Sequence, residues 1–371
     1  MKIALVIDWL TEVGGAERVL RAIHQIYPDA PIYTSQYRPR RISWFNDAKV
    51  KCGCLNLFPA GLRKFMAPLR LLYFNHLKLH GFDVIISICN SEAKAVRYDS
   101  GARHIAYLQG PPTQYYWGMY NSYIANPGFG KFNWLARIGL QLLVRPMRWA
   151  DLVISRRPSQ LVANSTYVQD EIKRYYRRDS VVLHPPVAVE KLLQLTVEPT
   201  NPFGDRKFFV VAGRQVNWKR FDLAIKACIK ASCALLLIGD GAEHDNLVKL
   251  ANGNPLIKFL PKYNGASEIA GYFKAAEGFI FCSKEPFGIT PVEALASGCP
   301  IIGLNAGGSL DIVQPGVNGA LFDRQTVTSL ATALQKFNRL DYSNKAVVNS
   351  AKRFSEAEFA KQLRSIIEGN S

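Results

Sequence analysis

The stretch FFVVAGRQVNWKRFDLAIKACIKASCALLLIGDG, residues 208–241, contains two apolar runs separated by a segment with helical spacing. Each run has the length and the continuous apolar character of a strand that is buried on both faces. A strand, a helix and a second strand in this order form a parallel pair with a crossover helix. The stretch therefore predicts a parallel sheet that is covered by helices.

The same alternation continues along the chain in both directions. Helical spacing also appears at 15–27 and 167–176. Further strand-like runs lie at 2–8, 31–35, 82–89, 104–108, 161–165, 257–261, 278–283 and 300–305. Residues 184–204 hold four prolines and a glycine, which is typical of a linker. We therefore expect an α/β chain with two doubly wound parallel sheets, with ligands at the carboxyl ends of the strands.

Size and charge are consistent with this interpretation. The 371 residues, 48% of them hydrophobic, are enough for two packed domains. The net charge is +17, with 25 Lys and Arg against 13 Asp and Glu in residues 1–190, and 21 against 16 in residues 191–371. This field favours anionic partners such as phosphates, nucleic acid or a membrane surface. A basic surface that only keeps the protein in solution is the alternative.

Neither a membrane span nor a metal site is indicated. No run of eighteen apolar residues occurs, and Asp8 interrupts the opening MKIALVIDWL, so this segment is interpreted as the first strand of a cytoplasmic protein. Of the seven cysteines only Cys52 and Cys54 are closely spaced, and no second pair or histidine cluster accompanies them. We expect reduced cysteines and no metal.

Two loops after predicted strands have the character of anion sites. Gly14 and Gly15 stand just before a helix, where backbone N–H groups are unpaired, although an ordinary strand-to-helix turn has the same pattern. In the second loop Arg214 and Lys219 flank the start of a helix, and Arg220 follows. Cations are unfavourable at that end of the helix dipole, so they indicate a bound anion. A diphosphate leaving group would gain charge there as its glycosidic bond breaks.

The third loop is KEPFGITPVEALASG, residues 284–298, with carboxylates at Glu285 and Glu293. Thr290 fits an N-cap, and Gly298 fits the position after the helix end. A capping box between Thr290 and Glu293 would explain Glu293 alone but leaves Glu285 unexplained. Carboxylates repel phosphate, so they should face hydroxyl groups. A ligand that has phosphates at its centre and a sugar at each end is a nucleotide-sugar.

At these residues the chain resembles the family-four retaining glycosyltransferases of GT-B fold. The resemblance covers nearly the whole chain and includes VANSTYV at 162–168, LHPPV at 183–187, IGDG at 238–241 and ALASGCPII at 294–302. It implies two Rossmann-like domains that face each other across a cleft. The expected boundaries are an acceptor-side domain at 1–190, a nucleotide-sugar domain at 191–353, and a C-terminal helix at 354–371 that packs back on the first domain.

The resemblance also implies roles for individual residues. Arg214 and Lys219 would grip the diphosphate, Glu285 would hold hydroxyls of the donor sugar, and Glu293 would hold the ribose. Backbone groups would contribute as well. Gly14 and Gly15 would back the diphosphate, Pro261 and Lys262 would border the base, and the cradle would consist of Phe287, Gly288, Ile289 and Thr290.

By the same resemblance the leaving phosphate oxygen takes the proton of the acceptor, and no metal is needed. The chain departs from the family at Gln109, in Tyr107-Leu-Gln109-Gly-Pro111, where relatives have a histidine beside the donor sugar. Glutamine can donate and accept hydrogen bonds but cannot become charged. Either Gln109 keeps the orienting role or the geometry of the donor differs.

Two segments of the first half bear on the acceptor. Residues 115–134 hold eight aromatic side chains, which can bind sugar rings or cover an apolar groove. Residues 57–82 mix apolar residues with Arg63, Lys64, Arg70 and Lys78. Such a segment can lie on an anionic membrane or pack as a helix with a solvated face. The charge favours a peripheral location at the inner face of the cell membrane, with a lipid-diphosphate-linked saccharide as acceptor.

The sequence as a whole predicts a retaining hexosyltransferase of surface or exopolysaccharide biosynthesis, with UDP-glucose or GDP-mannose as donor and a saccharide or lipid-linked saccharide as acceptor. A sugar-nucleotide epimerase of the same architecture is the alternative. A nucleic-acid-binding protein is suggested by charge alone, and no recognition motif supports it.

Overall fold

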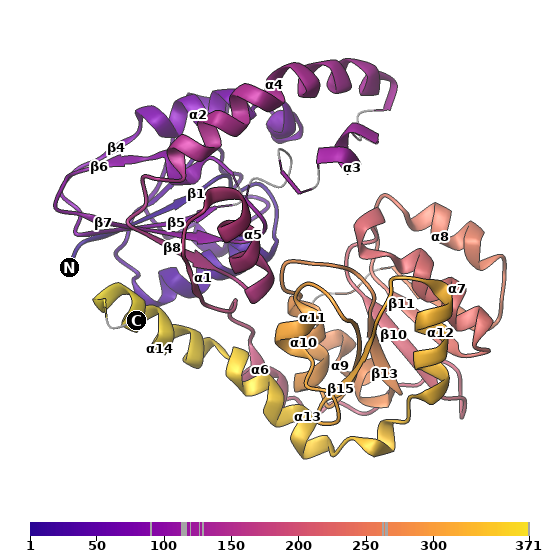
Figure 1. Ribbon diagram of the computed structural model, residues 1–371. Coiled ribbons are helices and arrows are strands. Elements are labelled where there is room, and N and C mark those ends of the chain that lie inside the picture. Colours follow the sequence, from indigo (N-terminus) through magenta and orange to yellow (C-terminus); the bar gives the residue numbers. More distant parts are fainter. Residues whose placement is uncertain are drawn as a thin grey trace. The chain divides into compact units, whose positions relative to one another are not determined.

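The computed structural model describes residues 1–89, 91–112, 117–118, 120–125, 127, 130–261, 263 and 266–369 (Figure 1). It contains two compact units. Unit 1 is Met1–Pro185 together with Ala360–Ser371, and unit 2 is Pro186–Phe359. The last helix, α14 (Glu356–Glu368), begins in unit 2 and ends in unit 1. There Arg103 donates to the carbonyl of Ile367 at 2.6 Å, which fastens the helix end to unit 1.

Unit 1 is built on a parallel sheet with strand order β3-β2-β1-β5-β7-β8-β9. Its strands are β1 (Ile3–Ile7), β2 (Ile32–Thr34), β3 (Val50–Cys52), β5 (Val84–Cys89), β7 (Arg103–Leu108), β8 (Gln160–Ala163) and β9 (Val181–Val182); β4 (Lys78–Leu79) and β6 (Arg97–Tyr98) form a separate pair. Its helices are α1 (Gly15–Ile26), α2 (Ala67–His76), α3 (Tyr120–Ala125), α4 (Asn133–Ile154) and α5 (Thr166–Tyr176). Strand order reverses between β1 and β5, so the ligand-binding edge expected for this topology lies at their carboxyl ends.

Unit 2 has a parallel sheet with strand order β12-β11-β10-β13-β14-β15. Its strands are β10 (Phe208–Ala212), β11 (Ala234–Ile238), β12 (Ile257–Leu260), β13 (Gly278–Phe281), β14 (Ile301–Leu304) and β15 (Gly319–Phe322). Its helices are α6 (Val189–Leu193), α7 (Phe221–Lys230), α8 (His244–Ala251), α9 (Ala266–Ala275), α10 (Ile289–Ala296), α11 (Ser309–Ile312), α12 (Val327–Lys336) and α13 (Asn344–Ala351). The order reverses between β10 and β13.

Helices cover both faces of the unit 2 sheet, as the continuous apolar runs predict. Phe208 and Val210 of β10 pack in one core with α6, α9, α10 and α13, whereas Phe209 and Val211 pack in a second core with α7, α8 and α12. Alternate residues of one strand thus serve opposite faces. The predicted α/β class and the predicted long strands are confirmed.

The boundary between the two units, after Pro185, falls inside the segment predicted as a linker, 184–204, and the rest of that segment is part of unit 2. Val187 forms a bridge with Ser355, and Val187, Val189 and Leu192 are buried in the first core of unit 2. The prolines flank a short helix, α6, whose apolar side chains are buried by packing against other elements of unit 2. The predicted linker thus contains the domain boundary, but from Pro186 onward the segment is packed in unit 2.

The basic segment 57–82 also differs from its prediction. Arg70 of α2 is buried and forms an ion pair with Glu92 at 2.9 Å, so it does not belong to a solvated basic face. The side chains of Arg63 and Lys64 lie outside the described residues, and Lys78 is exposed. Within the described ranges no helix is both long and apolar enough to cross a bilayer.

Candidate functional site

The loops that follow β10 and β13 meet at the point where the strand order of unit 2 reverses. Lys219 lies after β10 and Glu285 after β13. The ammonium of Lys219 donates to both carboxylate oxygens of Glu285, at 2.9 and 3.0 Å. The two side chains are 19% and 15% exposed, so the pair is shielded but reaches the surface. The structure thus brings together two of the predicted site residues.

Glu285 retains capacity for further hydrogen bonds. Its Oε1 accepts from the Ser283 hydroxyl at 2.6 Å as well as from Lys219, whereas Oε2 accepts from Lys219 at 3.0 Å. A carboxylate has about four lone-pair positions, so a bound hydroxyl can still be accommodated. Lys219 has three N–H groups and can share one with a neighbouring anion.

The other two cations of the loop have different environments. Arg214 is exposed, lies over the Trp218 ring at 5.9 Å, and makes no hydrogen bond or ion pair with any described residue. Arg220 instead forms two hydrogen bonds with Asp222, at 3.0 and 3.2 Å, and this contact raises its pKa. Arg220 is therefore a structural residue, which corrects its grouping with Arg214 and Lys219 as a third anion ligand.

The β10 loop is held by close backbone packing that the sequence analysis did not identify. Gln215 is fully buried and donates to the carbonyl of Gly239 at 2.6 Å. A Cβ on Gly239 would lie 2.2 Å from the Gly213 carbonyl oxygen, so the β10 and β11 loops can meet only through glycine. Gly213 itself has φ +137°, and a Cβ there would lie 3.2 Å from the Lys219 ammonium. This packing fixes where Lys219 can lie.

Helix α10 starts at Ile289, one residue before the predicted N-cap. Gly288 is the cap residue with φ +112° and makes no side-chain cap bond, so the predicted Thr290 cap was wrong. The glycine conformation turns the chain into the helix before Thr290 is reached. The first turn of a helix leaves N–H groups without an intrahelical partner, and here that turn follows Glu285 closely in the sequence.

The rest of the predicted cradle is built from the same turn. Phe287 inserts its ring into the unit 2 core, 5.3 Å from the Phe354 ring, so its side chain anchors the turn. Glu293 is buried within α10. Gly298 has φ +78° directly after the helix, as predicted for the residue past the end.

A pair of glycines after β14 supports this loop and was missed. Gly308 donates its N–H to the Glu285 carbonyl at 2.9 Å. A Cβ on Gly308 would lie 2.0 Å from the Phe287 carbonyl oxygen, and one on Gly307 would lie 2.7 Å from that of Glu285. The Gly-Gly pair directly after an apolar strand was the available signal, since the same pattern had been noted at Gly14 and Gly15.

The predicted base edge is described only in part. Pro261 is exposed directly after the edge strand β12, and Lys262 lies outside the described residues. The local chain direction follows from the parallel pairing of β12 with β11. The base contact remains a prediction.

In unit 1, Gly14 caps α1 in an extended conformation and Gly15 begins the helix. A Cβ on Gly14 would lie 2.9 Å from a carboxylate oxygen of Glu17, which is buried in the first turn. Gln109 follows β7, and its Nε2 is buried without a hydrogen-bond partner among the described residues. Its carbonyl accepts from Asn164 at 2.7 Å, so the backbone is fixed while the amide group is left to donate.

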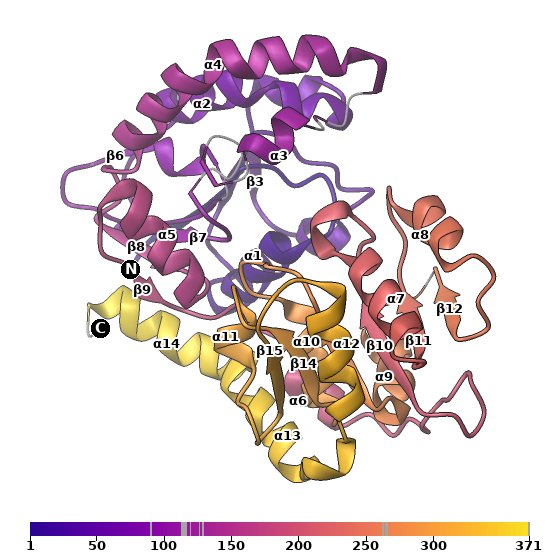
Figure 2. The same ribbon diagram turned by 45° about the vertical axis from the view of Figure 1, so that its right-hand side comes forward.

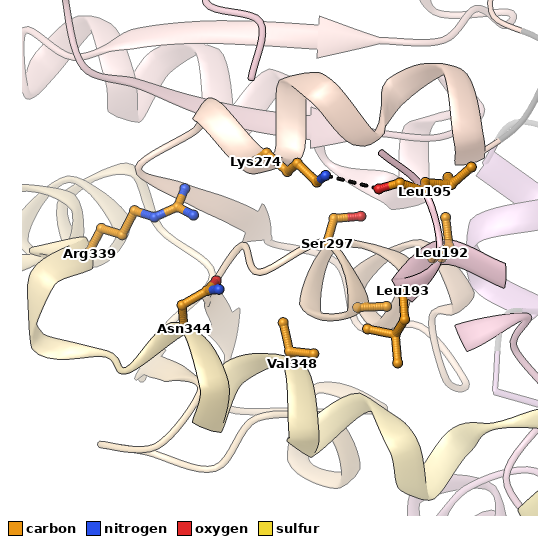
Figure 3. Close-up of a pocket in the computed structure, with 9 residues that line it drawn as sticks. Leu192, Leu193, Leu195, Lys274, Ser297, Arg339, Asn344 and Val348 are labelled. Carbon is orange, nitrogen blue, oxygen red and sulfur yellow. Dashed lines mark hydrogen bonds between the residues drawn. The ribbon is translucent and has the colours of Figure 1, made fainter. Parts of the chain in front are cut away.

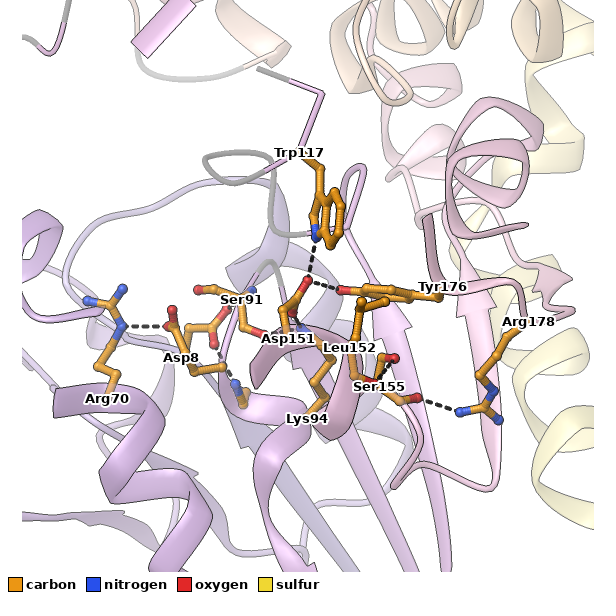
Figure 4. A network of polar contacts seen from close by, with 12 residues as sticks. Asp8, Arg70, Ser91, Lys94, Trp117, Asp151, Leu152, Ser155, Tyr176 and Arg178 are labelled. Carbon is orange, nitrogen blue, oxygen red and sulfur yellow. Dashed lines mark hydrogen bonds and ion pairs between the residues drawn. The ribbon is translucent and has the colours of Figure 1, made fainter. Parts of the chain in front are cut away.

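The carboxyl edge of the unit 1 sheet holds a buried ionic network (Figure 4). Asp8, after β1, accepts from the N–H groups of Ser91 and Ala93 at 3.0 and 2.7 Å. Lys94 pairs with Asp151 at 2.8 Å, and both side chains are at most 4% exposed. Burial lowers the pKa of Lys94, but the attraction of Asp151 outweighs it and the pKa is raised well above its usual value. The charged groups of this network are thus paired with other protein groups.

A cavity of about 400 Å³ lies elsewhere in unit 2 (Figure 3). It is bordered by Ser297 at the C-terminal end of α10, the end opposite Gly288. Its cations are already bonded, Lys274 to the carbonyls of Leu195 and Val197 at 3.2 and 3.0 Å and Arg339 to that of Gly298 at 2.9 Å. We therefore do not assign this cavity to the donor.

The chain is similar to known proteins in its sequence and its fold. Residues 195–357 match the family model described as Glycosyl transferases group 1. A D-inositol 3-phosphate glycosyltransferase of Corynebacterium kroppenstedtii is 31% identical over 131 residues, 34% of this chain and 29% of the relative. The human alpha-1,3/1,6-mannosyltransferase ALG2 is 28% identical over 198 residues, 52% of this chain and 42% of the relative. The chain thus spans less than half the length of these two relatives.

Solved structures extend the likeness to the whole chain. Anabaena Alr3699/HepE, solved in complex with UDP, has a TM-score of 0.67 at 19% identity and covers 100% of both chains. The lipopolysaccharide outer core galactosyltransferase WaaB has a TM-score of 0.69 at 15% identity, again over 100% of both chains. At such identities the likeness concerns the fold. Residues 195–357 therefore resemble the group 1 glycosyl transferases, and the chain has the α/β fold of the GT-B glycosyltransferases to which it is similar.

Proposed function

We propose that the chain transfers a hexose from a nucleotide-sugar to an acceptor hydroxyl, with retention of configuration. The observation that carries the proposal is the Lys219–Glu285 pair at the strand reversal of unit 2, with Glu285 in the loop that leads into α10. The group 1 family match over the same unit supports it. We further propose UDP-glucose or GDP-mannose as donor and a saccharide, free or linked to a lipid diphosphate, as acceptor.

The proposed chemistry separates the charge of the diphosphate from the hydroxyls of the sugar. Lys219, Arg214 and the first N–H groups of α10 would meet the diphosphate, which gains negative charge as the bond to the sugar breaks. Fixed cations and amides in this position favour the transition state over the ground state. With this set of groups we expect no divalent cation to be required.

Glu285 would orient the sugar rather than act as a nucleophile. Its pairing with Lys219 lowers its repulsion toward the diphosphate while its remaining lone pairs accept sugar hydroxyls. The C1–O bond to the diphosphate breaks, the acceptor oxygen bonds to C1 on the same face, and the acceptor proton passes to the departing phosphate oxygen. No protein base is required in this scheme.

The proposal is tested with Glu285→Ala and Glu285→Gln. Binding of UDP-, GDP- and ADP-sugars is measured by thermal stabilisation, and transfer to a saccharide acceptor by product formation. We expect one base to stabilise the protein, Glu285→Ala to bind it within a few-fold of wild type, and transfer by that variant to be lost. Unchanged transfer by Glu285→Ala would exclude the assigned role. Turnover of the donor to an epimer without acceptor would support the epimerase interpretation instead.

A further inference from the structure

Helix α4 carries an apolar stripe on the face that points away from unit 1. Its buried residues are Val144, Met147, Asp151 and Ile154, and none of residues 133–143 is buried. The exposed members of the stripe are Trp134 61%, Ile138 47%, Leu142 73%, Trp149 70% and Val153 43%. At about 100° per residue, the stripe falls within an arc of about 100°, opposite the buried face.

The charge of this region is one-sided. From Ser100 to Ala150 the sequence has five Lys and Arg and no Asp or Glu. Arg145 lies within the stripe, is exposed, and makes no hydrogen bond or ion pair with any described residue. Arg137 and Arg148 flank the stripe; Arg137 donates to the carbonyl of Ile124 at 2.9 Å, and Arg148 lies over the rings of Trp117 and Tyr120.

The stripe is held in place from behind. Arg157, in the turn after α4, donates to Asn75 of α2 at 2.5 Å. Asp151 of α4 accepts from Tyr176 and Trp117, each at 2.8 Å. In Figures 1 and 2 α4 runs beside α2 along one border of unit 1. The outer face of α4 can therefore contact a partner while the helix stays packed on unit 1.

We propose that the α4 stripe, Trp134, Ile138, Leu142, Arg145, Trp149 and Val153, docks unit 1 on the surface of an anionic bilayer. Tryptophan is favoured at the headgroup level because its ring is apolar and its N–H is polar. Aliphatic side chains between the two tryptophans enter the acyl boundary, and Arg145 meets lipid phosphates. Because the opposite face of α4 is packed on unit 1 from Val144 onward, the helix lies in the plane of the interface.

This inference rests on the proposed function in one respect only, namely that docking would bring a lipid-linked acceptor within reach of the protein. It also places the membrane contact outside residues 57–82, for which the sequence left both a membrane face and a packed helix open, on a helix whose basic and apolar pattern had not been singled out. Bilayer binding is a property of the free protein and requires no turnover.

The test is cosedimentation of the full chain with vesicles of phosphatidylethanolamine and anionic phosphatidylglycerol, and with vesicles of phosphatidylcholine. The variants are Trp134→Ser with Leu142→Ser, and Arg145→Glu. The controls are Leu340→Ser and Lys249→Glu, which change an exposed apolar and an exposed basic residue of unit 2. All replaced side chains are exposed, so thermal unfolding should remain that of wild type.

We expect wild type to bind anionic vesicles, the double variant to bind at least tenfold more weakly, and Arg145→Glu at least about fivefold more weakly. Both controls should bind within twofold of wild type. Equal binding by the double variant would overturn the proposal. The proposal would also be overturned if wild type did not bind vesicles but formed a dimer, and the double variant were a monomer. A second copy of the chain would then cover the stripe. Nucleotide-sugar binding, measured in parallel without lipid, reports separately on the proposed function.

Discussion

Both sheets place a lysine–carboxylate pair at their carboxyl edge, but the two pairs differ in their access to solvent. In unit 2 Lys219 and Glu285 are 19% and 15% exposed. In unit 1 Lys94 and Asp151 are 1% and 4% exposed, and the carboxylate also accepts from Tyr176 at 2.8 Å. The same chemical pair therefore serves two purposes. In unit 1 the pair is buried and holds the fold together, whereas in unit 2 the pair reaches the surface, where we propose that it meets a ligand.

The largest expected effect is on stability and comes from unit 1. Lys94→Met leaves the Asp151 carboxylate buried without its cation, which should lower the free energy of unfolding by about 3–5 kcal/mol. Denaturant unfolding of the purified chain measures this. Lys94→Met with Asp151→Asn removes both charges and should recover most of the loss. If the single variant were as stable as wild type, the contrast between the two edges would fail.

Lys219→Ala should have its effect on catalysis. Loss of one fixed positive group at the diphosphate should lower kcat/KM by about 10²–10³-fold, or roughly 2.7–4 kcal/mol. The unfolding free energy should change by less than about 1 kcal/mol because the pair reaches solvent. Steady-state transfer kinetics and denaturant unfolding are compared on the same preparation. A variant that loses stability but keeps its kinetics would assign this pair to the fold as well.

Acid should weaken unit 1 through His104. This histidine is fully buried; desolvation, with Arg157 and Arg178 nearby, lowers its pKa to about 3. The unfolded chain takes up the proton near pH 6.5, so the stability present above that pH is lost as pH falls toward 3. Between pH 7 and pH 5 this amounts to about 2 kcal/mol.

The measurement is the unfolding free energy of wild type and His104→Asn at both pH values. The variant should lose about 2 kcal/mol less than wild type between them, whereas His76→Asn, which replaces an exposed histidine, should follow wild type. Equal losses in His104→Asn and wild type would contradict the buried neutral state.

The smallest effect is expected from Gly213→Ala. The new Cβ would stand 3.2 Å from the Lys219 ammonium at a φ of +137°, which should cost about 1 kcal/mol of stability and lower kcat/KM several-fold. Gly316→Ala places an alanine at a positive φ of +76° with no atom within 4 Å, so it introduces backbone strain without displacing a cation. If both variants lost the same activity, placement of Lys219 would not be the cause.

The regular parts of the fold could be predicted because their signals are local. Apolar runs such as 208–212 and 234–238 are long enough to identify buried parallel strands without knowledge of their neighbours. The short strands β3, β4, β6 and β9 have two or three residues each. They are defined by their pairing with neighbouring strands, so no apolar run in the sequence predicted them. The apolar residues of α6 were hidden among prolines for a similar reason, since only their burial in unit 2 shows what they do.

The candidate site was predictable in its residue types but not in its partners. The spacing of Arg214, Lys219 and Glu285 indicated an anion and a sugar, yet nothing in it showed that Lys219 would bond to Glu285, 66 residues away. Spacing likewise could not distinguish the environments of Arg214 and Arg220. The guanidinium of Arg214 has no polar partner in the described chain, whereas that of Arg220 is hydrogen-bonded to Asp222. Such distinctions depend on contacts between segments that are remote in sequence.

The path of α14 bears on how the molecule can be divided. Because unit 1 contains both Met1–Pro185 and Ala360–Ser371, neither a cut after Pro185 nor a cut after Phe359 yields unit 1 intact. A fragment ending at Pro185 would leave the Arg103 guanidinium without the Ile366 and Ile367 carbonyls that receive it. Unit 2, by contrast, is one continuous stretch, although its last residues lie within α14, so a cut after Phe359 would divide that helix. Bilayer binding by unit 1 therefore calls for both ends of the polypeptide.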